Sequence, residues 1–132
     1  MSEATTNTPG NSLITGVPSG VVPYVMIAAA LVSAGIHLWL VPVVVAFDTT
    51  QAVLFVLAAV GFIAGVAVYV TRYWRREFYV FMVLLALAQI VAYFVMGGPA
   101  NAMAFVSKAA EAVVALAAAY LYTTAEPSGS AI

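Results

Sequence analysis

Four long apolar stretches dominate this sequence, at about 21–47, 52–71, 77–97 and 102–123. A helix needs about 20 apolar residues to cross the hydrocarbon core of a bilayer, and each stretch reaches that length. Hydrophobic residues make up 65% of the 132 residues and charged residues 7%, whereas soluble domains carry about 25% charged residues. The sequence therefore predicts an all-α membrane protein, folded as an antiparallel bundle of four transmembrane helices.

The segments outside these stretches are short and polar. Residues 1–20 are rich in Ser, Thr, Asn, Gly and Pro, and we expect them to form a disordered tail. No Lys or Arg precedes the first apolar run, which is also too long for a signal peptide, so we expect it to remain as a membrane anchor. The transmembrane domain then covers 21–124, and 125–132 form a short C-terminal tail.

Positive charge is concentrated in the loop between the second and third stretches. Arg72, Arg75 and Arg76 are three of the four basic residues in the chain. Loops rich in Lys and Arg remain on the cytoplasmic side, so we interpret these arginines as cytoplasmic topology determinants that lie beside anionic lipid. Both termini are then cytoplasmic, N-in/C-in, and the chain is predicted to be a multi-pass protein of the cell membrane.

Composition and motifs argue against several classes of function. The net charge of -1 does not suit nucleic-acid binding. The lack of cysteine excludes thiolate catalysis and iron–sulfur clusters, and no HExxH or GxSxG motif is present. The single histidine, His37, does not supply enough strong ligands for a metal site. We therefore expect no enzymatic activity, no metal and no cofactor.

The second stretch contains two glycines four residues apart, Gly61 and Gly65, and no polar side chain between 52 and 70. Small residues at this spacing let another helix approach closely in a membrane. We interpret them as helix-packing residues inside the bundle. A homodimer face is the alternative.

Polar side chains inside three of the stretches are the candidate site. They are His37 in the first, Gln89 and Tyr93 in the third, and Lys108 and Glu111 in the fourth. Ionisable residues inside a membrane are functional candidates. A rise of 1.5 Å per residue places His37, Gln89 and Glu111 within about 3 Å of the midplane and Lys108 about 6 Å from it. Lys108 and Glu111 are also spaced to pair on one helix face, so we predict one intramembrane polar cluster.

The cluster has two interpretations, which the sequence leaves open. In one, Lys108 and Glu111 form a neutralised ion pair that fixes how the helices pack. In the other, His37, Lys108 and Glu111 form a proton or ion relay, or line a polar ligand pocket. In either case the fourth stretch needs partners, since each charge opposes insertion by up to about 2.5–3.5 kcal/mol.

The chain resembles a group of short four-helix membrane proteins of halophilic archaea. The similarity lies in AGIHLWLVP at 34–42, the glycine- and arginine-containing segment 55–80, AQIVAY at 88–93 and VSKAAEAVVALAAAYLY at 106–122. That group has no established activity, so the resemblance implies an archaeal membrane protein with this fold.

These observations predict a small integral membrane protein that is not an enzyme. We expect an accessory subunit or binding module with a buried polar cluster. The alternative is a proton-coupled transporter or channel for a small solute or ion, using His37, Lys108 and Glu111. The expected partners are the lipid bilayer and either further copies of the chain or a larger membrane complex, but not nucleic acid.

Overall fold

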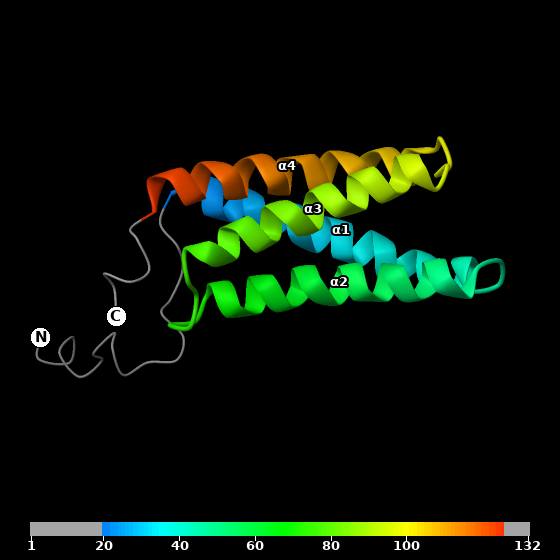
Figure 1. Ribbon diagram of the computed structural model, residues 1–132, viewed down its shortest axis with the longest axis horizontal. Helices are drawn as coiled ribbons and strands as arrows, with labels where there is room; N and C mark the ends of the chain where they lie inside the picture. Colours follow the sequence, from blue (N-terminus) through cyan, green and yellow to red (C-terminus); the bar gives the residue numbers. More distant parts are fainter. Residues whose placement is uncertain (1–19, 126–132) are drawn as a thin grey trace, which may run out of the picture.

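The computed structural model describes residues 20–125, and helices account for most of this part of the chain (Figure 1). They are α1 (Val22–Val44), α2 (Thr49–Tyr69), α3 (Glu77–Val95) and α4 (Ala102–Thr124). All four are long and apolar enough to cross a membrane. The predicted all-α fold with four membrane-length helices is confirmed, while the predicted tails lie almost entirely outside the described residues.

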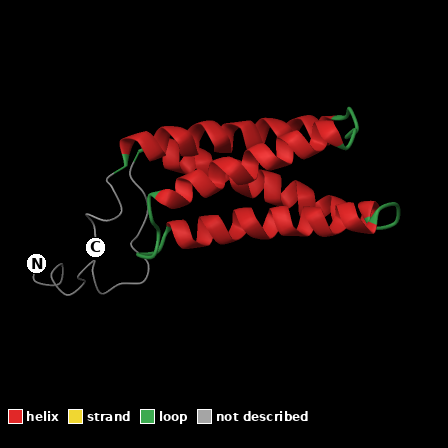
Figure 2. Cartoon of the chain, viewed as in Figure 1, coloured by secondary structure: helices red, strands yellow, loops and turns green. Residues whose placement is uncertain are grey.

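The loops gather at the two ends of the bundle (Figure 2). The loop from Val70 to Arg76 joins α2 to α3 at the end where α1 begins and α4 finishes, and we call this the arginine end. The loops from Val45 to Asp48 and from Met96 to Asn101 lie at the opposite end, which we call the cavity end.

The turn between α1 and α2 differs from the prediction. α1 contains Pro42 and ends at Val44 rather than at 47, because the Ala46 and Phe47 N–H groups donate to carbonyls three residues back, at 3.3 and 3.0 Å, which tightens the chain into a turn. The Asp48 N–H donates to the Val44 carbonyl at 2.8 Å and closes this turn. The Asp48 carboxylate accepts from the Gln51 N–H at 3.1 Å, so it caps α2, which begins at Thr49 rather than at 52.

Glycine ends α3 at the same end of the bundle. Gly97 has a φ of +67°, a left-handed conformation that glycine adopts without steric cost. The Gly98 N–H then donates to the Tyr93 carbonyl at 2.8 Å, which closes the last turn of α3. Asn101 caps α4 through a 2.9 Å hydrogen bond from the Ala104 N–H.

The core lies between α1 and α4, which form the centre of the bundle, with α2 packed on α1 and α3 packed on α4. Its fully buried apolar side chains come from all four helices: Met26, Ala30, Ala59, Phe62, Met82, Ala86, Val114 and Ala118. Small residues on α4 allow close approach, and α4 is the most buried of the four spans.

Contact between α2 and α3 is the least extensive of the neighbouring pairs. Leu85 and Met82 of α3 lie against Gly61 and Gly65 of α2, and the Tyr79 hydroxyl donates to that of Tyr69 at 3.0 Å near the arginine end. Toward the cavity end α3 diverges from α2 and runs beside α4 (Figure 1).

Candidate functional site

Glu111 of α4 is a charged side chain with no exposed surface. Its Oε2 atom accepts hydrogen bonds from the Ser33 hydroxyl at 2.8 Å and from the Ser107 hydroxyl at 2.9 Å. Its Oε1 atom lies 2.6 Å from the Lys108 ammonium nitrogen. That contact is a close ion pair rather than an aligned hydrogen bond, because Oε1 has no partner with hydrogen-bond geometry among the described residues. Both oxygens therefore face groups that stabilise a carboxylate.

His37 of α1 is the third member of this arrangement. Its Nδ1 atom lies 2.7 Å from the Ser33 carbonyl oxygen, and because a carbonyl can only accept, Nδ1 carries the proton. Its Nε2 atom faces Glu111 Oε2 at 3.7 Å. The ring also packs edge-on against Phe55 of α2, with ring centres 4.8 Å apart. The imidazole is thus held from three sides, with Nε2 the nitrogen left to exchange a proton or bind a ligand.

Lys108 connects α4 to α3. Its ammonium donates to the backbone carbonyl of Gln89 at 3.4 Å and lies 5.4 Å from the centre of the Tyr93 ring. Both contacts stabilise a cation within the bundle. The side chain keeps 17% of its surface exposed, whereas Glu111 keeps none, so Lys108 is the more accessible half of the pair.

Gln89 and Tyr93, the other two residues of the predicted cluster, contact Lys108 without using their polar side-chain atoms. The Gln89 side-chain amide donates to the Leu85 carbonyl of its own helix at 3.2 Å and makes no hydrogen bond to the ion pair within the described part of the chain. The Tyr93 hydroxyl donates to the Pro99 carbonyl in the following loop at 2.6 Å. Gln89 and Tyr93 reach Lys108 through a backbone oxygen and an aromatic face, because their polar side-chain atoms have partners closer along the chain.

Two serines outside the predicted cluster complete the site. Ser33 precedes His37 by four residues and Ser107 precedes Glu111 by four, so each lies on the same helix face as its partner. Both are buried. That spacing is the signal in the sequence that could have identified them.

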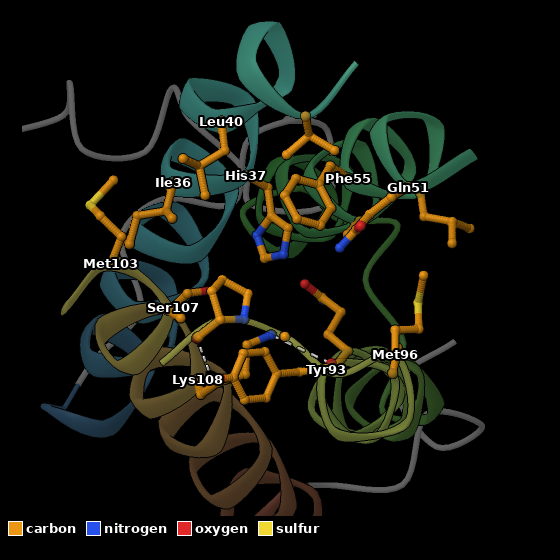
Figure 3. Close-up of a pocket in the computed structure, with 18 of the residues that line it drawn as sticks. Ile36, His37, Leu40, Gln51, Phe55, Tyr93, Met96, Met103, Ser107 and Lys108 are labelled. Atoms are coloured by element: carbon orange, nitrogen blue, oxygen red, sulfur yellow. Dashed lines mark hydrogen bonds between the residues drawn. The ribbon is translucent and has the colours of Figure 1, made fainter. Parts of the chain in front are cut away.

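A cavity of about 650 Å³ extends from this site to the cavity end. Figure 3 shows His37 and Phe55 on one side of it, with Lys108 and Tyr93 on the other. Its walls are mostly apolar and come from all four helices, including Ile36, Leu40, Leu54, Ala92, Met96 and Met103. Asp48, Gln51 and Asn101 lie near its mouth. Volume and lining match those of sites for small, largely apolar ligands.

The floor of the cavity is closed by the packed core. Met26, Phe62 and Met82 are fully buried between the polar site and the arginine end. The contact of Met82 and Leu85 with the α2 glycines closes the gap between α2 and α3 there. The polar groups therefore lie at the boundary between the half of the bundle that contains the cavity and the half that is filled by the packed core.

The predicted arginines lie far from this site, at the opposite end. Arg76 donates from Nε to the Tyr122 carbonyl at 2.9 Å, and its guanidinium lies 3.9 Å from the centre of the Tyr122 ring. Arg75 lies 3.4 Å from Glu77, and Arg72 lies over Tyr73. These contacts connect the loop to α3, to α4 and to itself. Among residues 20–125, no three His, Asp or Glu side chains are grouped to hold a metal ion.

The fold and the site define a class: a four-helix protein of membrane-spanning dimensions, with an internal ion pair at the floor of an apolar cavity. The chain belongs to a family of unknown function, DUF7475, whose model matches residues 8–122. Comparisons with curated proteins and with solved structures find no match. The resemblance to proteins of halophilic archaea therefore stays a prediction as to source, while membership of an uncharacterised family is confirmed.

Proposed function

We propose that this protein is a non-enzymatic binding module of the cell membrane that holds a small, largely apolar ligand inside the bundle. One observation carries the proposal: the cavity of about 650 Å³, with apolar walls and with His37, Gln89 and Lys108 at its polar floor. A ligand that partitions into the bilayer matches the walls, and one polar head group matches the floor.

We infer the orientation in the membrane from the arginines. Arg72, Arg75 and Arg76 favour a cytoplasmic arginine end, which supports the N-in/C-in topology. The cavity end then faces the outer side of the membrane, and the ligand enters from the outer leaflet or the external medium. The exposed apolar surface of the helices supports lipid as their surrounding.

Purification in a mild detergent followed by native mass spectrometry tests the binding function. We expect a co-purifying small molecule on the wild-type chain. Ala92→Phe adds a ring at the cavity wall and should remove that species. Ala119→Phe makes the same change at an exposed position of α4 and should retain it. Equal occupancy in wild type and both variants would place the ligand elsewhere.

A second function is favoured by the contact between His37 and Glu111. The 3.7 Å separation of Nε2 and Oε2 lets one proton move between the two groups through a water or a small displacement. Because the cavity reaches His37, the protein would then be a proton-coupled transporter or channel. Proteoliposomes with an internal pH dye test this: proton flux in the wild type that disappears in a folded Glu111→Gln variant supports transport, and no flux in either rejects it.

Whether the protein is an accessory subunit depends on its protein partners rather than on its ligand. A binding module can act alone or deliver its ligand to a larger membrane protein. A native pull-down with mass spectrometry separates the cases: a larger partner at fixed stoichiometry supports a subunit, and a homo-oligomer or monomer supports a stand-alone module.

A further inference from the structure

The polar groups at the cavity floor offer a specific combination of donors and acceptors. His37, Gln89 and Lys108 line the cavity, whereas Glu111 lies behind them with no exposed surface. A ligand head group in the cavity therefore contacts His37, Gln89 and Lys108. It can bond those of their polar atoms that have no partner within the described part of the chain.

Lys108 supplies the donor. An ammonium group has three N–H donors and no acceptor. The ion pair with Glu111 at 2.6 Å and the hydrogen bond to the Gln89 carbonyl at 3.4 Å engage at most two of them. At least one N–H is left, and the partly exposed side chain lines the cavity.

His37 and Gln89 supply acceptors. The proton of the neutral His37 ring is on Nδ1, bonded to the Ser33 carbonyl, so Nε2 is an acceptor. The Gln89 amide nitrogen donates to the Leu85 carbonyl, which identifies Oε1 as the free atom of the amide. Oε1 is buried and has no hydrogen-bond partner in the described part of the chain, so a ligand donor reaches it after a small rotation of the Gln89 side chain, which lines the cavity. A buried acceptor without a partner is destabilising, and a ligand donor would remove that cost.

From this geometry we infer that the ligand carries a hydroxyl head group on an apolar body, as in a long-chain alcohol, with the hydroxyl accepting from Lys108 and donating to Gln89 or His37. The inference rests on the proposed binding function and names its ligand class. A hydroxyl both donates and accepts, so it matches both kinds of floor group at once.

Other head groups match the floor less well. An ether or ketone accepts from Lys108 but leaves the acceptors of Gln89 and His37 without a donor. A carboxylate would bring a second negative charge beside a lysine that Glu111 already neutralises, and buried charge without compensation is costly. An ammonium head group would meet the Lys108 cation.

Competition between matched probes tests the inference on the full chain in detergent. The probes are primary alcohols of 10 to 16 carbons, their methyl ethers, the parent alkanes and the fatty acids, with bound species counted by native mass spectrometry. We expect each alcohol to exceed its methyl ether about tenfold, the ratio that roughly one additional buried hydrogen bond supplies. Ala92→Phe should abolish binding of both.

Substitution at Gln89 gives the second readout. Gln89→Leu should reduce the alcohol-to-ether ratio several-fold, since it removes one acceptor. Gln51→Leu makes the same change near the mouth of the cavity and should leave the ratio unchanged. If alcohol and ether bind equally to the wild type, or the fatty acid binds tightest, the hydroxyl inference is wrong while the binding function stands. If none of the probes binds and no co-purifying ligand is found, the proposed function fails as well.

Discussion

At the scale of single residues, Glu111 is the most tightly constrained polar group of the described chain. It accepts from two serine hydroxyls, lies 2.6 Å from the Lys108 ammonium and is fully buried. Removing one member of a buried ion pair leaves the other uncompensated, whereas removing both can be nearly neutral. The pair is therefore expected to be strongly coupled in its effect on stability.

Thermal unfolding in detergent measures this coupling. Glu111→Gln and Lys108→Met should each lower the free energy of unfolding by about 3–5 kcal/mol, and the double variant should lose less than either single variant. Glu77→Gln is the control, because it breaks a contact in which both side chains are largely exposed and should cost less than about 1 kcal/mol. Additive losses in the double variant would contradict a buried, coupled pair.

Residue spacing in the sequence predicts much of this site, but it does not predict all of it. The pairing of Lys108 with Glu111 follows from a separation of three on one helix, and the structure brings His37 to them. The sequence does not predict how Gln89 and Tyr93 contact Lys108, because a nearby carbonyl accepts from the polar group of each side chain and only a backbone oxygen and an aromatic ring lie against the ammonium. The position of a residue along its helix predicts which other residues lie at the same depth in the membrane. It does not predict which atoms the side chain bonds.

At the scale of the helices, the glycines of α2 decide where α2 and α3 meet. A Cβ built on Gly65 would lie 2.5 Å from Met82 Sδ, and one on Gly61 would lie 2.8 Å from Leu85 Cδ2. Both distances are shorter than side chains tolerate, and Met82 is fully buried. Close contact at these positions seals the bundle below the polar site.

Larger side chains at these positions should separate the two helices. Gly65→Leu is expected to destabilise the protein by about 1–3 kcal/mol through overpacking, with a clear drop in melting temperature in detergent. The effect of Gly61→Leu should be similar or smaller, because Leu85 is only partly buried. Gly35→Leu is the matched control: nothing lies within 4 Å of its added Cβ, so stability should be unchanged or higher. Equal effects at 35 and 65 would contradict a packing role.

The helices themselves were predictable, since apolar length and turn residues such as Asp48 and Gly97 mark their ends. The early end of α1 was not predictable, because Pro42 lies inside the helix without ending it and the turn that follows Val44 is made by backbone hydrogen bonds alone. The cavity had no sequence signal either. It arises from the divergence of α3 from α2 toward the cavity end (Figure 1), which depends on the packing of the whole bundle.

At the scale of the whole molecule, the two ends of the bundle differ in charge, in aromatic content and in access to the cavity. The arginine end carries the positive charge and an aromatic cluster in which Tyr69, Trp74 and Tyr79 pack edge to face, a composition typical of a membrane interface. The opposite end carries the mouth of the cavity, with Asp48 and Asn101 in its rim. The side from which a ligand reaches His37 and Lys108 is therefore set by the orientation in the membrane.

Cysteine labelling tests that orientation, because the natural chain has no cysteine and each introduced one is unique. Ala100→Cys places a thiol in an exposed loop at the cavity end, and Tyr73→Cys places one in the exposed arginine loop without removing an arginine. A membrane-impermeant maleimide added to intact cells should label position 100 and not position 73, since three arginines favour a cytoplasmic location for their loop. Permeabilised cells should label both, which controls for thiol reactivity. Labelling of position 73 alone in intact cells would reverse the topology and make the cavity, with His37 and Lys108 at its floor, accessible from the cytoplasm.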